Sequence, residues 1–122
     1  MTTNEYFANM REQGKGGEKF SSGAMRAYWA WVNTVEYKAE MFEVTDIPWG
    51  PELKDGAMAD FVNTLKAAGV IEFAVTDHST ALMEGIFELV SVGCKVKAPT
   101  IVKRHPEHWG DEEHYGLIFA IE

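Results

Sequence analysis

Apolar residues recur every three or four positions along much of the chain, and this spacing is typical of helices that bury one side. In the first such segment Phe7 and Met10 share a side, and a run rich in glycine follows. Pro51 opens a later segment, and Gly69 and Gly93 follow the ends of two others, as expected of helix termini. Four helices are predicted, at about residues 2–13, 22–44, 51–68 and 79–92.

Two of these helices have a well-defined apolar side. The helix from Ser22 to about Val44, with Ser21 or Ser22 as its cap, has a stripe formed by Met25, Tyr28, Trp29, Val32, Val35, Ala39 and Phe42. In the helix from Ser79 to Val92, the residues expected to face the core are Leu82, Met83, Ile86, Phe87 and Val90.

Three further segments have the alternating or β-branched pattern of strands. They are Val70 to Thr76, Cys94 to about Lys103, and residues 116–122. Pro99 indicates that the second is an edge strand or contains a bulge. Strand, helix and strand at this spacing predict a parallel crossover, with the last strand returning antiparallel. We therefore predict an α+β fold, a helical N-terminal half packed on a small three-stranded mixed sheet, in the order α-α-α-β-α-β-β.

Length and composition predict a single domain over residues 1–122, because 122 residues that are 46% hydrophobic suffice for one core and not for two. Residues 1–20 are expected to form an N-terminal helix and a glycine-rich joint that can move. The sequence contains neither the roughly 18 uninterrupted apolar residues of a membrane span nor a secretion signal. The single cysteine, Cys94, excludes an internal disulfide and suits a reducing compartment. We expect a cytoplasmic protein with no membrane association.

The chain is strongly acidic. Eleven Lys and Arg residues stand against 19 Asp and Glu residues, for a formal net charge of −8. This charge repels phosphate backbones and anionic lipids, so direct nucleic-acid binding is disfavoured. An acidic protein can still bind a basic partner, or compete with nucleic acid for a basic groove.

The second helix is apolar on more than one side, since it contains the sequence AYWAWV. Trp29, Trp31 and Tyr37 are candidate interaction residues. A helix of this kind is either central and covered all round, or its second side meets a protein partner or another copy of the chain. Both interpretations remain open from the sequence.

Acidic, imidazole and hydroxyl side chains come together in the segment VTDHST, where the first predicted strand ends. The candidate ligand-binding residues are Thr76, Asp77, His78, Ser79 and Thr80. Ligands and anions commonly bind where a strand ends and a helix starts, but the same residue types also cap helices for stability alone. Consecutive residues cannot converge as a Ser-His-Asp triad, so no catalytic residue is predicted.

A second polar segment contains His105, His108 and His114 together with four carboxylates. Imidazole and carboxylate groups are ligands for zinc, nickel or manganese. The spacing is not that of H-E-x-x-H, and Pro106 disfavours a helix that would present two of these histidines together. A metal site and a solvated loop are both consistent with the pattern, and no cofactor is predicted.

The segment DFVNTLKAAGVIEFAVTDHSTALMEGIFELVSVGCKV, Asp60 to Val96, resembles a segment of small uncharacterised bacterial proteins that are often encoded by phage-like or conjugative mobile elements. The similarity centres on T-D-x-S-T-x-L-M and G-C-K-V, which have no assigned chemistry. The resemblance implies a bacterial accessory protein and assigns no role to any residue.

Two functional hypotheses follow. The leading one is a small acidic, non-catalytic protein that binds a macromolecular partner or itself, as an accessory or inhibitor protein of a mobile element. The alternative is a ligand-binding domain or an enzyme, with a site for a small ligand or an anion at Thr76 to Thr80. The two differ in which substitutions should abolish binding, those in the tryptophan-containing helix or those at His78 and Ser79.

Overall fold

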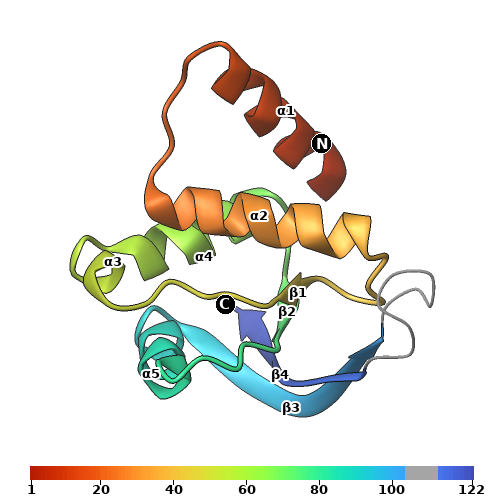
Figure 1. Cartoon of the computed structure of the whole chain (residues 1–122), viewed down its shortest axis with the longest axis vertical. Coiled ribbons are helices and arrows are strands. Elements are labelled where there is room, and N and C mark those ends of the chain that lie inside the picture. Colours follow the sequence, from red (N-terminus) through yellow and green to blue (C-terminus); the bar gives the residue numbers. More distant parts are fainter. Residues whose placement is uncertain (104–112) are drawn as a thin grey trace.

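The computed structural model describes residues 1–103 and 113–122, which form five helices and a four-stranded sheet (Figure 1). The combination confirms the α+β class. The elements are α1 (Thr3–Lys15), α2 (Ser22–Glu36), β1 (Glu43–Val44), α3 (Pro51–Lys54), α4 (Ala57–Ala67), β2 (Glu72–Val75), α5 (Leu82–Ser91), β3 (Cys94–Lys103) and β4 (Glu113–Ile121).

The strands lie in the order β1-β2-β4-β3. β1 and β2 are parallel, whereas β4 is antiparallel to both of its neighbours. β2 and β3 therefore run in the same direction, as the predicted crossover requires, with β4 between them. β3 is an edge strand with a register shift between Val96 and Ala98, next to Pro99. The predicted effect of this proline is confirmed.

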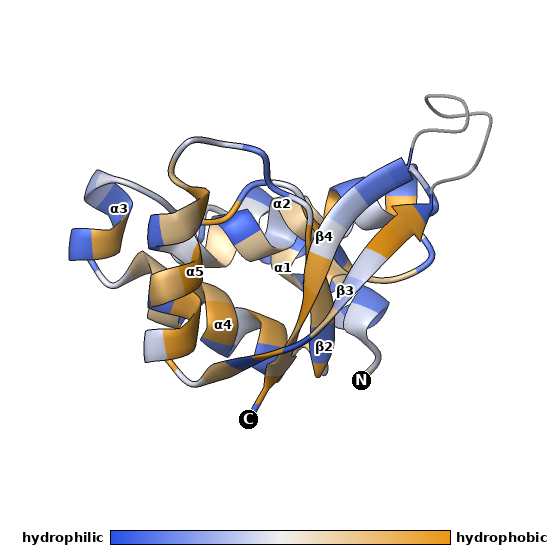
Figure 2. Ribbon diagram, turned by 90° about the horizontal axis from the view of Figure 1, so that it is seen from below, coloured by the Kyte–Doolittle hydropathy of each residue, from blue (hydrophilic) through white to orange (hydrophobic). Residues whose placement is uncertain are grey.

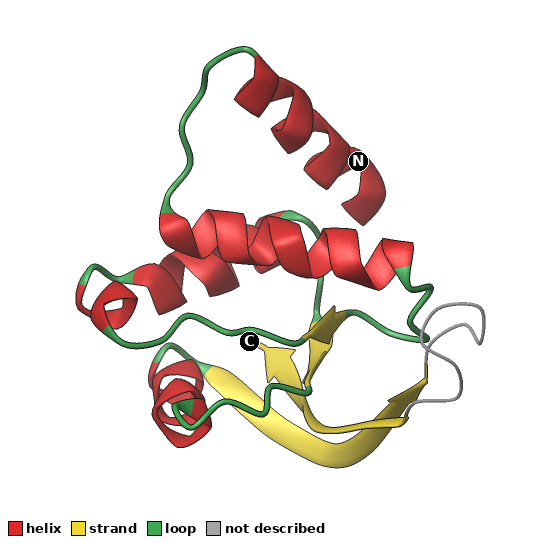
Figure 3. Ribbon diagram, viewed as in Figure 1, coloured by secondary structure: helices red, strands yellow, loops and turns green. Residues whose placement is uncertain are grey.

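The core forms where the helices cover the sheet, which is plain from the layered arrangement in Figure 3. Phe61 of α4 meets Phe73 of β2 edge to face, with ring centroids 6.1 Å apart, and Phe73 stacks on Phe119 of β4 at 6.0 Å. All three side chains are fully buried. Aromatic side chains from one helix and two strands thus pack against one another and join the helical layer to the sheet.

α1 packs on α2 through the side predicted from its sequence. A capping box between Thr2 and Glu5 starts the helix. Phe7 and Met10 are buried, and Phe7 stacks on Trp31 of α2 with ring centroids 5.5 Å apart. Ser21 caps α2 by accepting a hydrogen bond from the Ala24 N–H, as one of the two predicted alternatives.

The prediction of three strands is wrong, because the helix predicted to reach Val44 ends at Glu36 and β1 follows it. Lys38 has a positive φ of 50°, which a helix cannot continue through. The Thr34 hydroxyl then accepts the Glu43 N–H at 3.0 Å. A two-residue strand has no period of its own, and its apolar residues also fitted the helical spacing.

The predicted order of elements is also wrong between Pro51 and Gly69. Gly56, with a φ of 75°, separates a short α3 from α4 where one helix was expected. The observed order is α-α-β-α-α-β-α-β-β.

The inward side predicted for α5 is partly wrong. Met83, Phe87 and Val90 are 75%, 67% and 52% exposed. Gly85 and Leu89 are the buried residues of the helix, and a Cβ atom at Gly85 would lie 2.1 Å from the Ile47 side chain, so the glycine side of α5 faces the core. The ribbon of α5 carries the hydrophobic colour along much of its length in Figure 2, and part of this apolar sequence stays exposed.

The hairpin of β3 and β4 curls toward β1, at the opposite edge of the sheet. In Figure 1, β3 sweeps in an arc from the end of α5 toward the C-terminal end of α2. The Glu40 N–H donates to the Lys103 carbonyl at 3.1 Å, and His114 of β4 contacts Glu43 of β1. This curl brings the two edges together around polar side chains. Within residues 1–103 and 113–122, no helix has the length and apolar character needed to cross a membrane.

Candidate functional site

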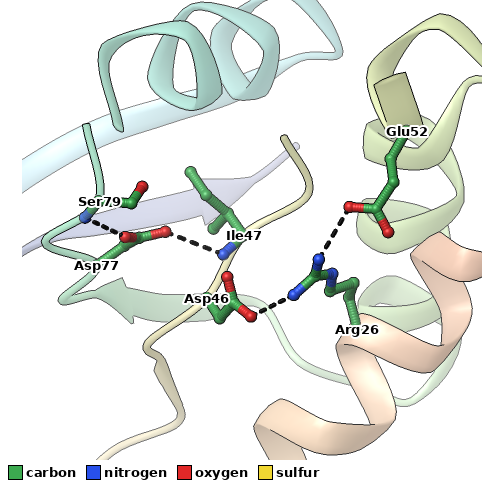
Figure 4. Close-up of polar contacts among 6 residues, drawn as sticks. All are labelled: Arg26, Asp46, Ile47, Glu52, Asp77 and Ser79. Atoms are coloured by element: carbon green, nitrogen blue, oxygen red, sulfur yellow. Dashed lines mark hydrogen bonds and ion pairs between the residues drawn. The ribbon is translucent and has the colours of Figure 1, made fainter. Parts of the chain in front are cut away.

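Asp77 ties together the segments that follow β1 and β2. These segments are neighbours because parallel strands have their carboxyl ends at the same edge of a sheet. One Asp77 carboxylate oxygen accepts the Ile47 N–H at 3.2 Å, and the other accepts the Ser79 N–H at 2.7 Å (Figure 4). Asp77 is 6% exposed. Its carboxylate is therefore used in holding the two segments in place.

Arg26 of α2 forms a second tie, to the segment after β1. Its guanidinium pairs with Asp46 and, at 2.9 Å, with Glu52 of α3 (Figure 4). Partial burial alone would lower the pKa of Arg26, but its contacts with Glu52 and Asp46 outweigh this effect and raise the pKa. The arginine therefore stays charged and bridges two elements.

A buried carboxylate, Glu43, lies on the edge strand β1, where the hairpin of β3 and β4 curls toward it. Glu43 is 2% exposed, and its Oε2 accepts a hydrogen bond of 2.6 Å from the Thr76 hydroxyl. The same oxygen is 2.7 Å from Nδ1 of His114. A buried polar group of this kind is tolerated because its oxygen has hydrogen-bonding neighbours. We call these three residues the Glu43 cluster.

A pocket of about 470 Å³ adjoins the Glu43 cluster. Among the described residues, those that line it are Thr45, Thr76, His78, Glu113 and His114. They come from the ends of β1 and β2 and from the start of β4. Hydroxyl, imidazole and carboxylate groups provide both donors and acceptors, so the pocket is suited to a small polar ligand.

The Glu43 cluster lacks the order of a nucleophile relay. In such a relay the imidazole lies between the hydroxyl and the carboxylate and takes the proton of the hydroxyl. Here the Thr76 hydroxyl donates directly to Glu43, and the carboxylate lies between Thr76 and His114. The Thr76 hydroxyl therefore has no imidazole acceptor for its proton within this cluster, and the arrangement leaves it unactivated.

The ligand residues predicted from the sequence do not all lie at one site in the structure. Thr76 and His78 line the pocket, whereas Asp77 turns toward Ile47 and Ser79. Ser79 and Thr80 are exposed. The predicted helix cap differs in detail, because α5 begins at Leu82 with no side-chain cap, and Asp77 closes a turn before it.

Two residues of the site, Glu43 and Thr45, were not identified from the sequence. Glu43 fell at the end of a predicted helix, where an acidic residue indicates a solvated surface, and Thr45 fell just beyond that helix. Glu113 was one of the four carboxylates considered with the histidines of the second polar segment. A charged residue between Phe42 and Val44 was the only signal of a strand with a buried polar side.

The predicted metal ligands are only partly within the described residues. His105 and His108 lie outside them. His114 belongs to the Glu43 cluster. In the part of the chain that the structure describes, no group of three or more His, Cys, Asp or Glu side chains could hold a metal ion.

The three candidate interaction residues of the second helix lie in different environments. Trp31 is 8% exposed, and its indole N–H donates to the Asn4 side chain at 2.9 Å, so it joins α1 to α2. Trp29 is 55% exposed, and Tyr37 is half-buried. Trp29, which was predicted on the inward stripe, is therefore exposed, whereas Trp31 is buried.

Cys94 is a buried thiol at the start of β3, only 2% exposed. Burial raises its pKa, because the charged thiolate is poorly solvated there. The thiolate is the nucleophilic form, so Cys94 is not suited to nucleophilic chemistry at neutral pH.

A protein-family model matches most of the chain. Neither a curated protein nor a solved structure matches the chain. A model described as a domain of unknown function, DUF7698, matches residues 26–122, which include every strand and the whole Glu43 cluster but not α1. The chain therefore belongs to the DUF7698 family.

Proposed function

We propose that this protein is a small acidic, non-catalytic cytoplasmic protein that acts by binding a macromolecular partner. The observation that carries the proposal is an exposed apolar row on α5. It consists of Met83, Phe87 and Val90, which we call the α5 stripe. An accessory or inhibitor role in a mobile element is part of the proposal and is motivated only by the sequence resemblance of Asp60 to Val96.

The α5 stripe differs from scattered surface hydrophobic residues. Its members are four and three positions apart, so they lie in a row along one side of the helix. Their exposures of 75%, 67% and 52% leave most of this apolar surface in water. Rows of exposed large apolar side chains mark surfaces that another molecule covers.

Replacing Phe87 with serine should weaken this association by about 30-fold, because a buried phenylalanine contributes about 2 kcal/mol. The free energy of unfolding should change by less than about 0.5 kcal/mol, since the side chain is exposed. Native mass spectrometry of protein purified gently from its source measures the bound partner or second copy. Urea unfolding measures stability.

Ile71→Ser is the matched control, because Ile71 is 73% exposed and lies outside α5. It should retain the complex. If Phe87→Ser retains the complex too, or if the wild-type protein has no stoichiometric partner and stays monomeric at high concentration, the α5 stripe is not an interface.

A second candidate function is binding of a small polar ligand in the pocket beside the Glu43 cluster. The supporting observation is a buried carboxylate with a histidine and a hydroxyl next to a pocket of about 470 Å³. In this case, protein from its source should carry a small molecule whose mass disappears on denaturation. The substitutions His78→Ala and Thr45→Val should abolish it, whereas Phe87→Ser should not. A wild-type chain with no such mass would exclude this candidate.

A further inference from the structure

A separate pocket lies between α1 and α2. The helices touch where Phe7 stacks on Trp31, and from there they diverge toward the joint that links them (Figure 1). The space between them forms an open pocket of about 310 Å³. This volume is at the lower end of the range for small-molecule sites. We call it the α1–α2 pocket.

The walls of the α1–α2 pocket are mainly apolar. The apolar side chains that line it are Met10, Phe20, Met25 and Trp29. Thioether and aromatic groups adapt well to hydrocarbon chains and rings. The lining therefore favours a ligand whose main body is apolar.

Two cations also line the pocket, although the chain as a whole has a net charge of −8. Arg11 and Lys15 are four residues apart on α1 and so lie on the same side of the helix. Arg11 is held in place, because its Nε donates to the Tyr28 hydroxyl at 2.7 Å. Its guanidinium also lies 5.4 Å from the ring centroid of Trp31.

Lys15 can exchange its present partner for a ligand. It pairs with Glu12 at 3.2 Å, but both side chains are more than two-thirds exposed, and such surface pairs contribute little. The rim of the pocket thus has one fixed cation and one movable cation beside apolar walls. This combination is complementary to an anion with an apolar body.

We propose that the α1–α2 pocket binds a small amphipathic carboxylate. Its apolar body lies against Met25 and Trp29, and its carboxylate pairs with Arg11 and Lys15. This site is distinct from the α5 stripe and does not depend on the partner-binding function. Both cations come from α1, which precedes the residues that the family model matches.

Three probes with the same tail and different head groups test the proposal. These are decanoate, decan-1-ol and decylammonium, titrated by isothermal calorimetry and tryptophan fluorescence. The two ions are kept below their micelle concentrations and the alcohol below its solubility limit. Decanoate should bind once per chain, and decan-1-ol about tenfold more weakly, because it lacks the charge-assisted hydrogen bonds. Decylammonium should bind most weakly, although non-specific attraction to an acidic protein would favour it.

Gly14→Leu should abolish decanoate binding while the melting temperature stays the same or rises. A Cβ atom at Gly14 would lie 3.8 Å from the Phe20 ring, an ordinary contact, and because Gly14 lines the pocket a leucine side chain there would occupy its volume. Arg11→Gln should weaken binding about tenfold. Lys66→Gln, which removes an exposed cation on α4, should leave it unchanged. Trp29→Phe should retain binding and lose the fluorescence change.

The proposal is overturned if decanoate does not bind, if decylammonium binds as tightly as decanoate, or if Gly14→Leu still binds decanoate. It is also overturned if Gly14→Leu abolishes a concentration-dependent dimer that decanoate does not dissociate, since the pocket would then hold a second copy of the chain.

Discussion

Replacing Gly23 with alanine is expected to lower the free energy of unfolding by about 3 kcal/mol, at the upper end of the range for overpacked cores. α2 and α4 meet at this glycine. A Cβ atom there would lie 2.1 Å from the Ala57 carbonyl oxygen, and 2.8 Å from both Asp60 Cβ and Phe61 N. These are atoms of the α4 backbone and of the start of a side chain, so no flexible group can move aside. The two helices would have to separate, which would disturb the core beneath them.

Urea unfolding followed by circular dichroism measures this effect, and Gly14→Ala is the control. Both glycines lie inside helices, but the nearest atom to a Cβ at Gly14 is 3.8 Å away. The control should gain about 0.5–1 kcal/mol, because alanine is the better helix former. Equal effects of the two substitutions would mean that helix propensity, and not close packing at Gly23, determines the outcome.

Replacing Asp77 with alanine is expected to lower the free energy of unfolding by a similar amount, about 3 kcal/mol, because two N–H groups lose a charged acceptor. The Ile47 N–H is the more important of the two, since Ile47 is 1% exposed and its N–H would be left unsatisfied. Ser79 lies at the surface, where water can replace the carboxylate. Asp77→Asn keeps one acceptor oxygen and should lie between wild type and Asp77→Ala.

His78→Ala is the control for Asp77→Ala. His78 is exposed and adjacent in sequence, so its removal should change the free energy of unfolding by less than about 0.5 kcal/mol. If Asp77→Ala is as stable as wild type and instead loses a bound ligand, Asp77 belongs to a binding site, and its structural assignment is wrong.

Hydrophobic periodicity was informative where an element is long and has one covered side. It predicted α1 with Phe7 and Met10 inward, and it placed β3 and the greater part of β4 as strands. It failed for β1, because two residues are too few to show a period of two. It located the covered side of α5 only in part, because Leu82 and Ile86 pack on the core whereas Met83, Phe87 and Val90 extend the apolar side beyond the part that the fold covers.

The candidate site could be predicted only in part for a similar reason. Thr76 and His78 were identified because the end of a strand before a helix is visible in a sequence. Glu43 was not, and Glu113 was considered only beside the candidate metal ligands, since nothing in the sequence indicates which distant strand lies beside Thr76. The curl of the hairpin of β3 and β4 brings His114 to Glu43, 71 positions away in the chain.

The sequence by itself determined the α+β class, the approximate positions of most helices and strands, and the acidic character of the protein. These properties depend on neighbouring residues or on sums over the chain. Tertiary structure alone decided that Asp77 holds two segments together, that Trp31 is buried and Trp29 exposed, and that Glu43 and His114 meet. Each of these depends on which surfaces pack against one another, and packing joins residues that are far apart in the chain.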